Sequence, residues 1–423
     1  MSRFLIIVLD GFGVGYMDDV LKVRPRDFGS NTARHILEKL PDSKWENLEK
    51  LGLMNILDFE TPFMKKVNVK IAGKSKLQHH GGDTFLGHQE LMGTKTEKPL
   101  NKPFSFYIDT VEKKLLEKGY KVERKGVNVN FLWVNDCIAI GDNLETDLGQ
   151  VYNVTTTFKN ISFEDELKIA QVVRDIVKVE RVIVFGGTKA TTQSILDAAR
   201  EKEGKYMGID APLSKVYEEG YMVRHMGYGV DPNNQVPTIL TKNNIDVMLI
   251  GKVADIVYNK NGESFMNLVD TKTIFELTLK KLDDFHKGFM CINVQETDLS
   301  GHSQNTKRYA NVLSIADKYI GKIIEKLNDD DILVITADHG NDPTIGHSQH
   351  TRENVPLLVY NKKLFNQKKN IDLGLRETMS DSANTVLEYF NIHENVEQGK
   401  SYLDLLKWEG VCKLYLHTLF FIK

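Results

Sequence analysis

The 423-residue sequence contains little cysteine and no marked excess of charge. Its three cysteines, Cys137, Cys291 and Cys412, are widely separated and form no CxxC pair, which argues against a disulfide-stabilised fold and against a thiolate zinc site. Lys and Arg number 55 against 58 Asp and Glu, so the formal charge is −3. This balance makes nucleic acid and anionic membrane surfaces unexpected partners.

Long apolar segments are also missing. No run approaches the roughly 18 consecutive apolar residues that a membrane-spanning helix needs. The apolar run at residues 4–9 is shorter than the ~7–15 residues of a signal-peptide core, and Asp10 ends it. We therefore expect a cytoplasmic protein that does not associate with membranes, and nothing in the sequence indicates a protein partner.

Short apolar runs rich in β-branched residues recur along the chain, as expected for strands buried on both faces of a parallel sheet. They cover residues 4–9, 181–185, 247–250, 289–294, 332–336 and 355–360. Segments with helical periodicity lie between them, at residues 273–285, 305–327 and 382–390. The alternation predicts an α/β core with a mostly parallel sheet flanked by helices.

The middle of the chain has a different pattern. Turn signals such as Gly126, Gly141 and Gly186-Gly187 are frequent, an amphipathic helix is expected near residues 163–179, and fully apolar strands are fewer. We predict a smaller, inserted α+β cap domain at residues 99–228, which splits the core into residues 1–98 and 229–409. The apolar tail at residues 410–423 follows the last predicted helix and has no assigned role.

Carboxylates and histidines gather directly beside the predicted core strands. They are Asp10, Asp298, His302, Asp338, His339 and His350. Because ligands bind at the carboxyl ends of the strands in an open parallel sheet, these side chains are expected to converge on one site. A single Asp-His pair would more often be a cap, a turn or a surface feature. The whole set offers mixed ligation that suits Zn²⁺ or Mn²⁺, with enough ligands for two cations, a common arrangement in phosphoryl transfer.

A candidate nucleophile lies in the segment Gly81-Gly82-Asp83-Thr84. Thr84 follows a glycine-rich turn where a helix is expected to begin, and free N–H groups at a helix N-terminus favour bound phosphate. A threonine hydroxyl becomes nucleophilic when a metal ion or a base removes its proton. The alternative is that Thr84 is simply the N-cap of that helix.

The glycine-rich segment at residues 11–15 also suggests a dinucleotide-binding loop. However, Tyr16 stands where the fingerprint has its last glycine, and no strand ending in Asp or Glu follows about 20 residues later. The sequence therefore argues against a dehydrogenase.

Together these segments resemble the alkaline phosphatase superfamily of metalloenzymes and, within it, the phosphopentomutases. The resemblance is carried by residues 4–15, 29–36, 83–90, 336–343 and 350–356, with further matches at 250–256 and 224–225. It implies an alkaline-phosphatase-like core with a cap inserted in it. It also implies transfer of phosphate between the 1 and 5 positions of ribose or deoxyribose through a phosphothreonine at Thr84.

The resemblance further implies two divalent cations, usually Mn²⁺. One cation is assigned to Asp10, Thr84, Asp338 and His339, and the other to Asp298, His302 and His350. The expected partner is a small sugar phosphate, with a sugar bisphosphate as activator. Lys252 and Arg224 are candidates for contacts to the substrate, although ion-paired surface positions would explain them equally well.

Three features depart from the phosphopentomutase pattern. Asp298 and His302 are four residues apart, a spacing more similar to that of cofactor-independent phosphoglycerate mutases. Gly82 and Gln89 replace the usual lysine and tryptophan, and residues 182–187 lack an expected arginine, the residue type that grips phosphate bidentately. A metal-dependent phosphatase or a mutase of another phosphorylated metabolite is therefore an alternative. A metal-binding protein without catalysis is a third reading, against which a hydroxyl among the proposed ligands argues.

Overall fold

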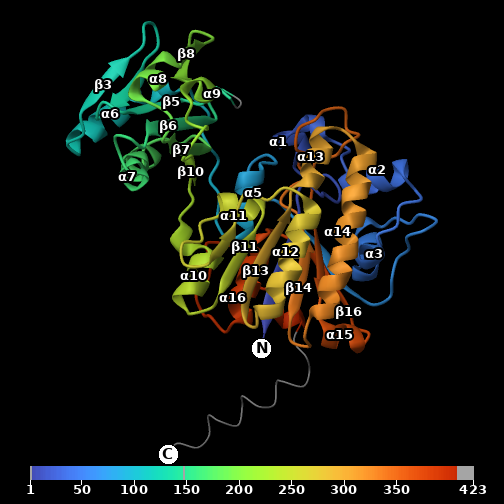
Figure 1. Cartoon of the computed structure of the whole chain (residues 1–423). Coiled ribbons are helices and arrows are strands. Elements are labelled where there is room, and N and C mark those ends of the chain that lie inside the picture. Colours follow the sequence, from blue (N-terminus) through green and yellow to red (C-terminus); the bar gives the residue numbers. More distant parts are fainter. Residues whose placement is uncertain (1, 146–147, 407–423) are drawn as a thin grey trace, which may run out of the picture. The chain divides into compact units, whose positions relative to one another are not determined.

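The computed structural model describes residues 2–145 and 148–406, so the predicted tail at residues 410–423 and Cys412 lie outside the described residues. The chain divides into two compact units (Figure 1). The core unit comprises Met1–Thr96 and Asp231–Lys423, and the cap unit comprises Glu97–Val230. None of the described helices combines the length and the apolar composition that crossing a bilayer requires.

An eight-stranded sheet forms the centre of the core unit. Its strands, in spatial order, are β12 (Glu263–Phe265), β11 (Val247–Ile250), β13 (Gly288–Val294), β1 (Arg3–Leu9), β14 (Ile332–Thr336), β15 (Val355–Tyr360), β2 (Lys70–Ser75) and β16 (Asn370–Arg376). The central strand β1 is buried along its whole length and pairs in parallel with β13 and β14. The predicted α/β class with a mostly parallel sheet is therefore confirmed.

One core strand departs from the parallel pattern expected of the apolar runs. β15 is antiparallel to both of its neighbours, β14 and β2. The connection at residues 337–354 contains no helix, so the chain turns back at the same edge of the sheet instead of crossing over. Residues that precede β15 consequently lie at the edge where β1, β13 and β14 end.

Helices flank this sheet, as predicted. The core helices are α1 (Val20–Val23), α2 (Thr32–Lys39), α3 (Glu46–Leu51), α4 (Leu53–Leu57), α5 (Thr84–Leu91), α10 (Val236–Lys242), α11 (Lys252–Ile256), α12 (Thr271–Asp284), α13 (Glu296–His302), α14 (Thr306–Lys326), α15 (Lys362–Asn366) and α16 (Ser380–Tyr389). Figure 1 shows α12 and α14 lying across the strands of the sheet. The longest helix, α14, begins after the cap Asn305 and buries an apolar stripe against α2, α3, α12 and α13, while α16 packs with α5 and α10.

The cap unit has its own sheet and two apolar layers. Its six strands, in spatial order, are β10 (Met222–Gly227), β7 (Arg181–Gly187), β6 (Val151–Thr157), β5 (Ile138–Asp142), β4 (Phe131–Val134) and β3 (Val122–Lys125). Only β6 and β7 run parallel. The remaining described elements are α6 (Ile108–Glu117), α7 (Phe163–Arg174), α8 (Thr192–Asp197), α9 (Ala211–Ser214) and the hairpin β8 (Ala199–Lys202) with β9 (Tyr206–Ile209).

Side chains alternate between the two faces of the cap sheet. On β4, Leu132 and Val134 belong to one apolar cluster, whereas Phe131 and Trp133 belong to another. This period of two is expected of a strand, because successive side chains point to opposite faces. The cap sheet is therefore covered by apolar packing on both faces.

Candidate active site

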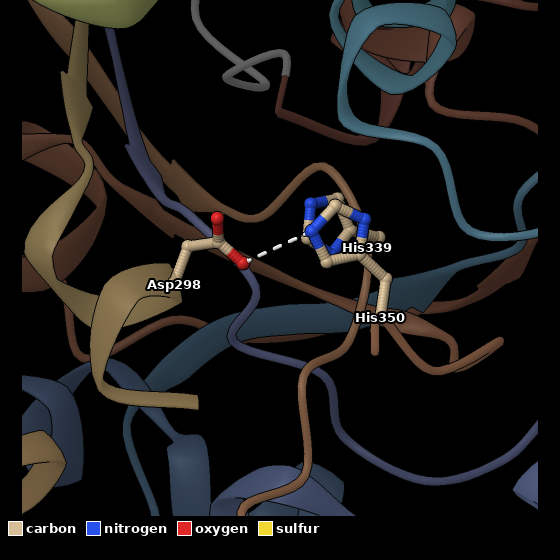
Figure 2. A group of neighbouring side chains, drawn as sticks. All are labelled: Asp298, His339 and His350. Carbon is tan, nitrogen blue, oxygen red and sulfur yellow. Dashed lines mark ion pairs between the residues drawn. The ribbon is translucent and has the colours of Figure 1, made fainter. Parts of the chain in front are cut away.

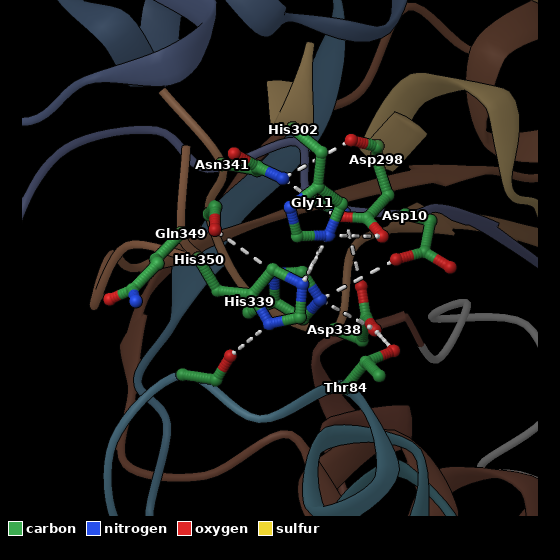
Figure 3. A network of polar contacts seen from close by, with 12 residues as sticks. Asp10, Gly11, Thr84, Asp298, His302, Asp338, His339, Asn341, Gln349 and His350 are labelled. Carbon is green, nitrogen blue, oxygen red and sulfur yellow. Dashed lines mark hydrogen bonds and ion pairs between the residues drawn. The ribbon is translucent and has the colours of Figure 1, made fainter. Parts of the chain in front are cut away.

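Five segments deliver polar side chains to the edge of the core sheet at which β1, β13 and β14 end (Figure 3). Asp10 directly follows β1, and Asp338 and His339 follow β14. After β13 the chain enters α13, on which residues four apart share one face. The antiparallel direction of β15 returns residue 350 to this edge, and α5 begins there at residue 84. The topology thus assembles side chains that are distant in the sequence.

A first cluster contains Asp10, Thr84, Asp338 and His339. His339 Nε2 lies 3.5 Å from Asp10 Oδ1 and 3.2 Å from Asp338 Oδ2. The Thr84 hydroxyl donates a hydrogen bond of 2.6 Å to the same Asp338 oxygen. The two carboxylates and the imidazole are fully buried. The structure therefore brings together the four residues that were predicted to share one cation.

A second cluster contains Asp298, His302 and His350, with His339 beside it (Figures 2 and 3). His350 Nε2 lies 3.3 Å from Asp298 Oδ1, and His302 Nε2 lies 3.3 Å from Asp298 Oδ2. The rings of His339 and His350 stack with their centroids 3.9 Å apart. The three residues predicted to hold the second cation thus lie around one carboxylate, next to the first cluster.

Hydrogen bonds to backbone carbonyls determine the tautomers of the three histidines. The Nδ1 atoms of His302, His339 and His350 lie 2.7–2.9 Å from the carbonyl oxygens of residues 348, 340 and 82. Because a carbonyl oxygen can only accept, each Nδ1 carries the hydrogen, and a neutral ring then presents a lone pair at Nε2. This second interaction of the ring is typical of metal-binding histidines.

The Nε2 atoms face one another and the carboxylates, where a neutral ring directs its lone pair and a protonated ring donates a hydrogen. His302 Nε2 and His350 Nε2 are 3.0 Å apart. Asp10 Oδ1 and His339 Nε2 are buried and have no hydrogen-bond partner. Lone pairs and carboxylate oxygens converging in this way are what a divalent cation requires, and the triads Asp10-Asp338-His339 and Asp298-His339-His350 each place ligand atoms within 4.8 Å of one another.

Comparison with known proteins identifies the family. A family model described as the Metalloenzyme superfamily matches residues 2–394. The phosphopentomutase of Clostridium kluyveri is 30% identical over 414 residues, covering 96% of this chain and 100% of the relative. The phosphopentomutase of Acetivibrio thermocellus is 32% identical over 414 residues, covering 95% of this chain and 99% of the relative. The chain belongs to the phosphopentomutase family of metalloenzymes.

This family membership confirms the prediction of a metal-dependent mutase. Among solved structures, the PH0037 protein from Pyrococcus horikoshii aligns with 92% of this chain and 96% of its own, with a TM-score of 0.43 and 14% identity.

The electrostatics of this phosphopentomutase-family site keep the carboxylates of Asp298 and Asp338 charged. Burial by itself would raise the pKa of Asp298, but the imidazoles of His350 and His302 lower it well below its usual value. Burial would also raise the pKa of Asp338, but His339 and His88 lower it by more, so this pKa too lies well below its usual value. Charged carboxylates at neutral pH are the form that binds a cation.

The two candidate substrate contacts lie in different units. Lys252 begins α11, and its Nζ lies 3.0 Å from Asp10 Oδ2 and 3.6 Å from Asp298 Oδ2. These carboxylates raise its pKa against the opposing effect of burial. Lys252 therefore joins the two clusters as a largely enclosed cation, with 13% of its side chain exposed. Arg224 lies on β10 of the cap unit, opposite Val184, and its role stays a prediction.

Thr84 is not the N-cap of its helix. Asp83 caps α5 by accepting a hydrogen bond of 2.8 Å from Leu86 N, and Thr84 is the first helical residue. Close packing holds the helix against the cluster, because a Cβ atom at Gly87 would lie 2.5 Å from the carbonyl oxygen of Asp338. The alternative of a capping role for Thr84 was therefore wrong, and its hydroxyl is directed at Asp338.

Sequence reasoning missed three polar residues around the clusters. His88 Nδ1 lies 2.9 Å from the Thr84 carbonyl oxygen, and its Nε2 lies 2.7 Å from Asn293 Oδ1. Because both partners accept, the His88 ring carries hydrogens on both nitrogens and is a buried cation, 3.2 Å from Asp338 Oδ2. The spacing of four residues between Thr84 and His88 could have indicated this, since such residues share one helix face.

The other two missed residues are asparagines that orient carboxylates. Asn293 Nδ2 donates to Asp10 Oδ2 over 2.9 Å, and Asn341 Nδ2 donates to Asp298 Oδ1 over 2.8 Å. Asn293 is a polar residue inside an otherwise apolar strand, a signal that could have been used. Asn293 holds one oxygen of Asp10 and leaves the other facing His339, whereas Asn341 holds the Asp298 oxygen that faces His350.

Proposed function

We propose that this protein is a phosphomutase that interconverts ribose or deoxyribose 1-phosphate and the corresponding 5-phosphate through a phosphothreonine at Thr84. The observation that carries the proposal is the position of the Thr84 hydroxyl, 2.6 Å from Asp338 Oδ2 and beside two clusters of candidate metal ligands. The names of the relatives, which are phosphopentomutases, support a pentose phosphate as substrate.

Two divalent cations, for which Mn²⁺ is our candidate, would fit the clusters and would offset the charge of a bound phosphate and favour ionisation of the Thr84 hydroxyl. The first would be held by Asp10, Thr84, Asp338 and His339, and the second by Asp298, His302 and His350. The chain itself contributes orientation: Asp338 accepts the hydroxyl hydrogen of Thr84 and fixes the rotamer of this side chain. His88 places a positive charge against the same carboxylate.

The proposed cycle conserves the phosphate groups. Phosphorylated Thr84 gives its phosphoryl group to the free hydroxyl of the incoming sugar monophosphate, so the P–O bond to Thr84 breaks and a sugar bisphosphate forms. The bisphosphate reorients and returns its other phosphoryl group to Thr84, which releases the isomeric monophosphate. A sugar bisphosphate added from outside would phosphorylate unmodified Thr84 and is the proposed activator.

Lys252 and Arg224 are the proposed contacts to the substrate. Lys252 lies against Asp10 and Asp298, so its ammonium group would face anions bound between the clusters. The sugar itself depends on the cap, which lacks the expected arginine at residues 182–187. A mutase of another metabolite is a second candidate, because Asp298 and His302 occupy one face of α13 with the spacing of phosphoglycerate mutases.

A coupled assay with Mn²⁺ tests the substrate. Ribose 1-phosphate, deoxyribose 1-phosphate, glucose 1-phosphate and 3-phosphoglycerate are each supplied with and without a matching bisphosphate. We expect turnover of the pentose phosphates, stimulation by the bisphosphate and loss of activity with chelator. Steady release of inorganic phosphate would identify a phosphatase instead, and turnover of glycerate phosphate alone would favour the second candidate.

Transfer of label to the protein tests the intermediate. With ³²P-labelled sugar bisphosphate, we expect label on Thr84 in the wild type and none in Thr84→Ala, with metal content near that of the wild type. The matched control is Thr273→Ala, because Thr273, in the first turn of α12, also donates a 2.6 Å hydrogen bond to an aspartate, the N-cap residue Asp270. Undiminished turnover in Thr84→Ala would refute the mechanism.

A further inference from the structure

A fully buried glutamate, Glu353, lies between the loops that follow β1 and β14. Its carboxylate occupies the space that side chains would fill at two glycines. A Cβ atom at Gly13 would lie 2.3 Å from Glu353 Oε2, and one at Gly340 would lie 2.5 Å from Oε1. Real Cβ atoms do not approach so closely, so both loops require glycine where they meet this side chain.

Four hydrogen bonds hold the Glu353 carboxylate in this position. Oε2 accepts from Gly15 N at 3.1 Å and from Thr32 N at 2.9 Å. Oε1 accepts from the hydroxyl of Thr32 at 2.7 Å and from that of Thr351 at 2.6 Å. Each oxygen thus has two donors, which offset part of the desolvation that raises the pKa of Glu353 to about 7. The donors come from three segments that are far apart in the sequence.

The same segments carry the proposed metal ligands. Asp10 precedes Gly13 in one loop, and Asp338 and His339 directly precede Gly340 in the other. A second connection runs through Thr32, whose hydroxyl accepts from Asn341 N at 3.2 Å. Since the Asn341 side chain donates to Asp298, three hydrogen bonds in series connect the carboxylate of Glu353 to Asp298, and this carboxylate also contacts both loops.

We propose that Glu353 is a positioning residue, whose carboxylate sets the separation between the loop that carries Asp10 and the loop that carries Asp338 and His339. This inference rests on the proposed function, because it takes these side chains as ligands of one cation. It also explains the glycine-rich segment at residues 11–15 that resembled a dinucleotide-binding loop. Gly13 admits the carboxylate and Gly15 donates to it, so the glycines serve Glu353 and not a pyrophosphate.

Titration of the protein with Mn²⁺, followed by the electron paramagnetic resonance signal of free Mn²⁺, tests the proposal without an activity assay. The variant is Glu353→Gln, which keeps the size of the side chain but replaces one acceptor oxygen by an amide NH₂ that faces donors. We expect the wild type to bind two Mn²⁺. In Glu353→Gln, one of the two is expected to bind about 10- to 100-fold more weakly, as is typical when a group that orients metal ligands is removed.

The matched control is Asp317→Asn. Asp317 is a buried carboxylate of α14 that accepts from the backbone N–H groups of Asn47 and Leu48 at 3.0 and 2.8 Å, and it does not belong to the loops of the site. We expect Asp317→Asn to lower the melting temperature and to leave both Mn²⁺ affinities at the wild-type value. An equal loss of Mn²⁺ affinity in this control would overturn the proposal, because general destabilisation would then explain both variants.

A milder variant, Thr351→Val, removes one hydroxyl donor to Glu353 and keeps the proposal testable if Glu353→Gln does not fold. It is expected to weaken the same Mn²⁺ site by up to about 10-fold. If Glu353→Gln and Thr351→Val, wherever they fold, bind Mn²⁺ with wild-type affinity, the proposed role of Glu353 is overturned. The proposed function would still stand in that case. Failure of the wild type to bind Mn²⁺ would instead refute the ligand assignment on which the proposed function depends.

Discussion

Two carboxylates buried at the candidate active site of the core unit, Asp298 and Asp338, and two buried in the cap unit, Asp142 and Glu166, differ in their protonation. In the core, neighbouring imidazoles hold the pKa values of Asp298 and Asp338 well below the usual range, although burial opposes this. In the cap, burial raises the pKa of Asp142 to about 6 and that of Glu166 to about 9. Neither carboxyl oxygen of Glu166 has a hydrogen-bond partner.

The difference shows that burial does not by itself decide the charge of an acid. Asp142 accepts hydrogen bonds from Phe104 N and Met207 N, which partly offset its desolvation, whereas the Glu166 carboxyl group of α7 is buried without such donors. At the candidate active site, Lys252 and the imidazoles lie against Asp298 and Asp338 and keep these two carboxylates ionised. This site is thus electrostatically prepared for cations, and the cap holds Glu166 as a neutral acid at physiological pH.

The largest effect is expected when one core carboxylate becomes an amide. In Asp338→Asn, the charge that pairs with His339 and His88 disappears, and Thr84 loses its charged acceptor. We expect turnover to fall by at least about 10³-fold, as for other groups that act as part of a catalytic unit. Elemental analysis should find one divalent cation fewer per chain than in the wild type. Full metal content and full activity in Asp338→Asn would contradict the role proposed for the ionised carboxylates of the core.

The next effect concerns an ion pair at the opposite end of β1. The buried Arg3 guanidinium contacts Asp331 at 2.6 and 2.9 Å and donates to the carbonyl oxygens of Leu282 and Lys326. Arg3→Ala leaves the Asp331 carboxylate buried without its cation, so we expect a loss of about 3–5 kcal/mol in the free energy of unfolding. Urea unfolding of the full chain measures it. Arg3→Lys, which keeps the charge but not the planar fork, should recover only part of the loss.

The same change from carboxylate to amide should have the opposite result in the cap. Because the pKa of Glu166 is raised on folding, its contribution to stability is fully present below the unfolded value and is lost as pH rises toward 9. Glu166→Gln removes this loss and should stabilise the protein by about 2–4 kcal/mol at pH 8, with little change at pH 5. Thermal unfolding at both pH values provides the measurement. A pH-independent difference would show that ionisation of Glu166 plays no part.

The smallest effect is expected at an exposed ion pair of the cap. Arg124 of β3 contacts Glu112 and lies 2.6 Å from Asp109, but all three side chains are accessible to water. Arg124→Ala should therefore lower the free energy of unfolding by less than about 1 kcal/mol. Arg3 contacts one buried carboxylate and Arg124 contacts two solvent-accessible ones, so comparison with Arg3→Ala shows whether burial or the number of carboxylate partners determines the loss. A loss as large as that of Arg3→Ala would contradict this explanation.

The local pattern of apolar residues predicted the central strands of the core sheet. The apolar runs at residues 4–9, 289–294 and 332–336 are the central strands β1, β13 and β14, because strands buried on both faces need continuous apolar sequence. The cap strand β3 was not predicted, since three of its four residues are charged and none is fully buried. The direction of β15 depends on how a connection turns in space, and an apolar run carries no information about this.

The candidate ligands could be predicted because they follow strands, whose ends the topology brings together. His88, Asn293 and Asn341 could not be assigned roles in the same way, since each acts on a residue from another segment. The role of Glu353 was equally hidden. Its partners Gly13, Thr32 and Gly340 become neighbours only after the sheet has formed.

The pairing of β1 also has a consequence for synthesis of the chain. Arg3 pairs with Gly288 and Phe4 with Ile332, so the first strand leaves the ribosome long before either neighbour exists. The described strands of the cap, by contrast, pair only with one another and are complete once residue 227 has emerged. Under the proposed assignment, a cation cannot gain its last ligand until residue 350 is translated. Under this assignment the metal centre can be completed only late in synthesis. The apolar strand β1 must be kept from aggregating until its partner strands have been translated.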